Sequence, residues 1–233
     1  MSSLRLALLA SIALAIPTAA SARPSLDHER LTQLAAYDVL VFGDPHANGI
    51  ERGKAIGVFD ATPEEVFRVA TDYSKWKDYL PRVRGSNVLS SDGGKTIVEM
   101  IAELPWPAST EHVQARYIAE KLAGEIYRIR FEMSEGSMKQ YLGAIYIEPW
   151  TAQHDKSAVT YELVAEPDIL APKSAINKLI RRSASGFVHA LRQHINELHR
   201  LGYLHPLQPK PEPTPALPLT GDMKASVGGT PRR

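Results

Sequence analysis

Alternating apolar and polar residues divide the middle of the chain into short strands. Within residues 125–133, the apolar side chains Tyr127, Ile129, Phe131 and Met133 alternate with polar ones, a pattern typical of a strand with one buried face. Runs rich in β-branched or aromatic residues predict further strands over 38–42, 54–59, 95–104, 111–119, 139–148 and 157–165. Because the spacers between the later strands are short, we expect an antiparallel meander.

Helical periodicity appears on both sides of these strands. Apolar residues recur every three or four positions over 173–201, which predicts one long amphipathic helix. Thr62, Pro63 and Glu65 form a helix-start signal and predict a helix from Pro63 to about residue 73. Two shorter helices are expected, over residues 25–36 and 74–80. A sheet of this kind buries one face by curling around the long helix, so we expect an α+β domain.

The two ends of the chain differ from this domain. Residues 1–22 contain one basic residue, Arg5, then an apolar run and an Ala-Ser-Ala triplet ending at Ala22, the pattern of a cleaved secretory signal peptide. The apolar run is shorter than the roughly 20 residues of a membrane-spanning helix. The alternative to a cleaved signal peptide is a membrane anchor that the mature protein retains. Seven of the 17 prolines fall in residues 204–233, which predicts a disordered tail. We expect one domain over 23–203 in a periplasmic or secreted protein.

Charge and composition exclude several classes of function. The 27 basic residues balance 26 acidic ones, which argues against a protein that tracks the phosphates of nucleic acid. The absence of cysteine excludes disulfides, thiolate metal sites and a cysteine nucleophile. The sequence has no metalloprotease, serine-hydrolase or phosphate-loop motif. We therefore expect a protein that uses no metal and no cofactor. We also expect a monomer.

The order of elements and motifs resembles the START / Bet v 1-like (SRPBCC) superfamily. Its bacterial polyketide cyclase/dehydrase and lipid transport proteins and its coenzyme Q-binding START-like proteins look nearest. The resemblance covers about residues 34–198, and the motifs that carry it are residues 60–67, 72–76, 80–81 and 104–107, with Gly143 and Pro149. It implies a helix-grip fold, in which a curved antiparallel sheet wraps around the C-terminal helix and encloses a hydrophobic cavity. Members mostly bind lipids, sterols, isoprenoids or polyketides, and a minority catalyse cyclisation or dehydration.

Candidate ligand-binding residues lie on the faces expected to point inward. Tyrosine suits such a wall because its ring packs while its hydroxyl orients a polar group. The small residues 183–186 leave volume opposite the sheet, whereas charged residues such as Glu99, Glu103 and Arg116 are expected on the solvent face. A packed core without a cavity is the alternative. The candidates are Val98, Met100, Tyr117, Tyr127, Ile129, Phe131, Tyr141, Ile145, Tyr161, Ala184, Phe187 and Val188.

Three functions are compatible with this sequence. The leading hypothesis is an exported protein that binds and transports a lipid or another hydrophobic small molecule in the cavity. One alternative is a cyclase or dehydratase that uses His112 as an acid or base. The other is an envelope interaction protein that acts through the proline-rich tail. Aromatic residues at Trp76, Tyr79 and Trp106 suggest transient membrane contact, with packing against the domain as the alternative.

Overall fold

The computed structural model describes residue 34 and residues 38–104, 110–150 and 154–204. The predicted signal peptide, most of the predicted helix over 25–36, Trp106 and nearly all of the proline-rich tail lie outside the described residues. None of the helices in the described ranges is long and apolar enough to cross a membrane.

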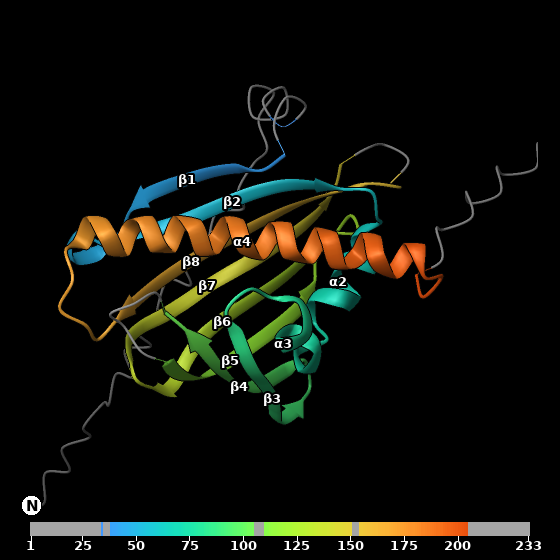
Figure 1. The fold of residues 1–233 in the computed structure, drawn as a ribbon. Helices are drawn as coiled ribbons and strands as arrows, with labels where there is room; N and C mark the ends of the chain where they lie inside the picture. Colours follow the sequence, from blue (N-terminus) through green and yellow to red (C-terminus); the bar gives the residue numbers. More distant parts are fainter. Residues whose placement is uncertain (1–33, 35–37, 105–109, 151–153, 205–233) are drawn as a thin grey trace, which may run out of the picture.

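The described residues form one antiparallel sheet of eight strands, in the spatial order β1-β2-β8-β7-β6-β5-β4-β3 (Figure 1). The predicted meander is confirmed. Strands β3, β4, β5, β6 and β7 each pair with the strand that follows in the sequence, and β8 also pairs with β2. The strands are β1 (Leu40–Pro45), β2 (Glu51–Phe59), β3 (Val83–Asp92), β4 (Lys95–Glu103), β5 (Thr110–Lys121), β6 (Tyr127–Gly136), β7 (Met138–Pro149) and β8 (Ser157–Pro167).

Short helices connect β2 to β3. They are α2 (Pro63–Ala70), the 3-10 turn η2 (Tyr73–Lys75) and α3 (Trp76–Tyr79), while a further 3-10 turn, η1 (Ala47–Gly49), joins β1 to β2. The capping box that starts α2 is confirmed: the Thr62 hydroxyl accepts from the Glu65 amide, and the Glu65 carboxylate accepts from the Thr62 amide at 2.9 Å. The helix ends at Ala70, earlier than predicted, because the chain leaves helical geometry at Asp72.

The long helix α4 (Lys173–Arg200) lies along one face of the sheet (Figure 1). Its apolar stripe, from Ile176 to Ile195, is buried as predicted. Two glycines of β2 allow the close approach. A Cβ at Gly53 would stand 2.7 Å from Ile180 Cγ2, and a Cβ at Gly57 would stand 2.7 Å from Val188 Cγ1. The sheet therefore grips the helix, and the predicted α+β helix-grip fold is confirmed.

Candidate functional site

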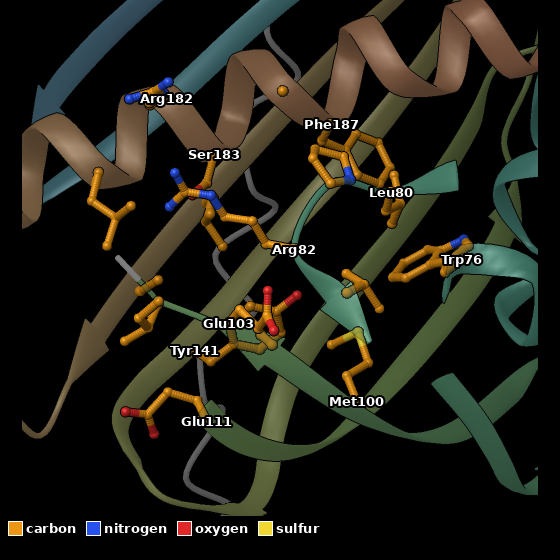
Figure 2. Close-up of a pocket in the computed structure, with 18 of the residues that line it drawn as sticks. Trp76, Leu80, Arg82, Met100, Glu103, Glu111, Tyr141, Arg182, Ser183 and Phe187 are labelled. Carbon is orange, nitrogen blue, oxygen red and sulfur yellow. The ribbon is translucent and has the colours of Figure 1, made fainter. Parts of the chain in front are cut away.

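A cavity of about 460 Å³ lies between the first half of α4 and strands β3, β4, β7 and β8 (Figure 2). Its volume falls in the lower half of the range of about 300–1,000 Å³ that small-molecule sites occupy. Figure 2 shows Phe187 and Ser183 reaching from the helix toward Tyr141 and Met100 on the sheet. The remaining lining residues are Trp76, Leu80, Pro81, Arg82, Val83, Ala102, Glu103, Leu104, Glu111, Met138, Tyr161, Leu163, Ala165, Leu179, Arg182, Ser185 and Gly186.

Aromatic rings form the most rigid part of the cavity wall. The Tyr161 ring stacks on Phe187 with centroids 4.2 Å apart, and Trp76 meets Phe187 edge-on at 5.8 Å. Trp76 is buried, and its indole N–H donates to the Ala70 carbonyl at 3.2 Å. Trp76 therefore packs against the domain and is not exposed for membrane contact. Tyr79 is half-buried and stacks on His194.

The structure places four of the twelve predicted ligand-binding residues on the cavity wall. Met100, Tyr141, Tyr161 and Phe187 line the cavity. The other eight are buried in the core beside it and do not line this cavity: Val98, Tyr117, Tyr127, Ile129, Phe131, Ile145, Ala184 and Val188. Strand alternation shows which side chains point inward but not where along the strands the helix leaves space. That these residues bind ligand stays a prediction.

The small residues of α4 explain why the space lies where it does. Ser183, Ser185 and Gly186 all line the cavity, as expected from the run of small side chains. Short side chains on a helix leave a gap that the sheet opposite cannot fill, because the backbones are held apart by the larger residues on either side. This stretch of helix therefore forms the roof of the cavity.

Four charged residues also line the cavity, and two of them change the sequence-based prediction. Glu103 was expected on the solvent face, but at the end of β4 it lines the cavity and pairs with Arg84 at 2.6 Å. Glu111 was not a candidate, yet it is only 5% exposed and accepts a hydrogen bond from the Ser137 hydroxyl. Arg82, from the turn before β3, and Arg182 of α4 supply opposite charges.

His112 lies on the other face of β5. The inward residues of this strand are Glu111, Val113, Ala115 and Tyr117, so the intervening His112 is exposed. It does not line the cavity, and the geometry gives no support to an acid–base role there. The alternation that places Val113 and Tyr117 inward also places Glu111 inward, so the sequence carried a signal for the residue that was missed.

Three tyrosines, Tyr117, Tyr141 and Tyr161, pack around Phe131 at the cavity wall. The Tyr117 hydroxyl lies 3.4 Å from that of Tyr141 and 3.6 Å from Met100 Sδ. Burial raises the pKa of all three phenols, most strongly for Tyr117 and Tyr161. All three therefore remain neutral hydrogen-bonding groups at physiological pH.

The described residues contain no cluster of three or more His, Asp or Glu side chains that could hold a metal ion. What this part of the chain offers a ligand is an apolar space with aromatic walls and a few polar groups.

Comparisons with known proteins agree with this architecture. Residues 59–192 match the family described as polyketide cyclase / dehydrase and lipid transport, whereas no curated protein matches the sequence. A STAR-related lipid transfer protein fragment from Xanthomonas axonopodis has a similar structure, with a TM-score of 0.61 and 19% identity over 68% of this chain and 93% of that one.

Two further solved structures share the fold at lower identity. Human STARD10 has a TM-score of 0.61 and 13% identity, over 77% of this chain and 83% of its own. The Zhui aromatase/cyclase from Streptomyces sp. R1128 has a TM-score of 0.55 and 11% identity, over 64% and 95%. The chain therefore belongs to the polyketide cyclase/dehydrase and lipid transport family, and its helix-grip START fold is one that binds lipids and other hydrophobic ligands.

Proposed function

We propose that this protein binds one hydrophobic small molecule or lipid in the cavity under α4 and carries it through water. The observation that supports the proposal most strongly is the 460 Å³ cavity with its wall of aromatic and aliphatic side chains. Burial of an apolar ligand there removes its surface from water, which contributes about 25 cal/mol per Å² to the affinity.

The size of the cavity favours a compact ligand. Because 460 Å³ is in the lower half of the range for small-molecule sites, a single-chain or ring-shaped amphiphile fits better than a lipid with two acyl chains. We expect movement of α4 or an adjacent loop to accompany binding and release, as in other proteins whose loops or helices gate a site.

A fluorescent apolar dye such as an anilinonaphthalene sulfonate tests the proposal. We expect one saturable site per chain and a loss of binding of at least tenfold in Ser183→Trp, because the indole would occupy the cavity under α4. The matched control is Gln193→Trp, which adds the same side chain at an exposed position of α4 outside the cavity. Unchanged binding in Ser183→Trp, with Gln193→Trp also unchanged, would contradict the proposal.

A cyclase or dehydratase in the same cavity is the second candidate function. The specific observation in its favour is Glu111, a buried carboxylate that lines the cavity and bonds to Ser137, since such a group can accept a proton from a bound substrate. The two functions differ in outcome: a carrier releases its ligand chemically unchanged, whereas an enzyme converts it in a Glu111-dependent way. Mass spectrometry of a bound polyketide-like ligand before and after incubation, with wild type and Glu111→Gln, separates them.

We further propose that the protein acts outside the cytoplasm. The support is the pattern of residues 1–22, with one basic residue, a short apolar run and a small-residue triplet before Arg23. Fractionation of the host cells and N-terminal sequencing test this proposal. We expect a periplasmic or secreted form that begins at Arg23; a cytoplasmic form that retains Met1 would contradict it.

A further inference from the structure

We propose that the cavity under α4 selects ligands that carry a positively charged amine, and that the Glu111 carboxylate binds this group. The inference rests on the proposed function, because it names the chemistry of the ligand that the cavity holds. It comes from a buried acidic side chain to which the described part of the chain gives no positively charged partner.

Glu111 lies on the wall of the cavity. It is only 5% exposed and lines the cavity from β5. Figure 2 shows it on the sheet side, across from α4. Within the described ranges its carboxylate accepts a hydrogen bond from one group, the Ser137 hydroxyl. The His112 N–H donates to that hydroxyl at 3.2 Å and so holds it in place.

A second buried carboxylate among the described residues, Glu65, has a full set of partners. It accepts from the amide and the hydroxyl of Thr62, at 2.9 and 3.0 Å, and lies 3.4 Å from His199 Nε2. Glu111, by contrast, forms no ion pair with any Lys, Arg or His side chain that the structure describes. Because a charge that is buried without a counter-charge costs free energy, Glu111 lacks a partner that a ligand can supply.

The other charged groups of the cavity do not take this role. Glu103 already pairs with Arg84, 2.6 Å away. Arg82 and Arg182 are exposed to solvent, and Figure 2 shows Arg82 reaching toward α4, away from Glu111. Water and salt screen exposed charges far more than buried ones. The buried carboxylate of Glu111 therefore sets the charge preference at the sheet side of the cavity.

A ligand ammonium group would complete this site. It brings a full positive charge and several N–H donors, and hydrogen bonds between charged groups are roughly twice as strong as neutral ones. A ligand carboxylate in the same place would meet a like charge. The apolar walls formed by Met100, Tyr161 and Phe187 would bury the rest of the ligand. The cavity therefore suits an amphiphile that combines one amine with a compact apolar body.

Three naphthalene ligands of similar shape test this inference. 2-(Aminomethyl)naphthalene carries an ammonium where 2-ethylnaphthalene carries a methyl group, and 2-naphthylacetate carries a carboxylate. We expect wild type to bind the amine about tenfold or more tightly than the acetate. Glu111→Gln should weaken binding of the amine by about tenfold or more, the effect of one hydrogen bond to a charged group, and change binding of 2-ethylnaphthalene less than about twofold. Titration calorimetry measures these dissociation constants.

Glu135→Gln is the matched control. It removes the same charge at an exposed position of β6 that does not line the cavity, so all three affinities should stay at their wild-type values. The inference would be overturned, while the proposed function stands, if Glu111→Gln affected the amine and 2-ethylnaphthalene equally, if Glu135→Gln weakened the amine as much as Glu111→Gln, or if wild type preferred the acetate. If wild type binds none of the three ligands, the proposed function fails and the inference fails with it.

Thermal unfolding shows whether Glu111→Gln folds and tests the premise of the inference. Glutamine keeps the shape of the side chain and can still accept from Ser137, while the buried charge is removed. Without ligand, the melting temperature of the variant should therefore equal or exceed that of wild type. The amine should raise the melting temperature of wild type more than that of the variant. A variant that melts well below wild type would show that the chain itself stabilises the carboxylate and would overturn the inference.

Discussion

The buried tyrosines make the stability of the protein sensitive to alkaline pH. Burial raises the pKa of Tyr117 and Tyr161 above the value of the unfolded chain, which is about 10. The folded protein then holds protons that the unfolded chain releases, so the free energy of unfolding should be nearly constant below pH 9.5 and fall above pH 10. Each such tyrosine contributes up to about 1.4 kcal/mol per pH unit.

Urea unfolding between pH 8 and pH 11 measures this slope. Tyr117→Phe should reduce the slope above pH 10, whereas Tyr203→Phe should not, because Tyr203 is 72% exposed. Equal slopes in wild type and both variants would contradict the link between burial and titration. At the scale of single residues, alternation in β5 is sufficient to place Glu111 inward and His112 outward, but Glu111 was not among the residues predicted to line the cavity.

Two glycines, Gly53 in β2 and Gly186 in α4, should respond in opposite ways to an added methyl group. A Cβ at Gly53 would meet Ile180 Cγ2 at 2.7 Å and the Ile180 backbone at 3.1 Å, so Gly53→Ala should push α4 off β2 and lower the free energy of unfolding by about 1–3 kcal/mol. A Cβ at Gly186 would meet only Pro81 Cγ, at 3.4 Å, and alanine favours helix, so Gly186→Ala should stabilise by up to about 1 kcal/mol.

Chemical denaturation of the two variants provides the comparison. If Gly53→Ala were as stable as wild type, the conclusion that α4 packs closely against Gly53 of β2 would be contradicted. At the scale of elements, apolar periodicity predicted α4, and runs rich in β-branched and aromatic residues predicted strands β4 to β8, because each of these elements buries apolar side chains against the rest of the domain. It missed β3, an edge strand whose residues 86–92 are mostly exposed and whose register shifts twice, so no apolar alternation was needed to form it.

Leu204, the last residue that the structure describes, belongs to the core. Leu204 is 3% exposed and packs in the core, and its N–H donates to the Leu198 carbonyl. A chain that ends at Leu204 should keep the stability and dye binding of the full chain, whereas one that ends at Tyr203 should lose about 1.5–3 kcal/mol, the value of burying one leucine. Urea unfolding of the two truncations tests this. Equal stability would show that Leu204 contributes nothing to the core.

The arrangement of the whole molecule was the least accessible to residue-level reasoning. The pairing of β2 with β8 and the position of the cavity under residues 179–187 of α4 depend on contacts between residues far apart in sequence. The resemblance to START-like proteins supplied the overall architecture, but it did not show which inward residues line the cavity. That depended on where α4 carries Ser183, Ser185 and Gly186.

The central claim, that this protein carries a hydrophobic ligand under α4, is tested most directly by native mass spectrometry of the protein purified from its own host. We expect wild type and Gln193→Trp to carry one molecule of an extractable apolar compound per chain, and Ser183→Trp to carry none. A protein that is empty in every form, or a compound that remains bound in Ser183→Trp at the wild-type level, would contradict the account.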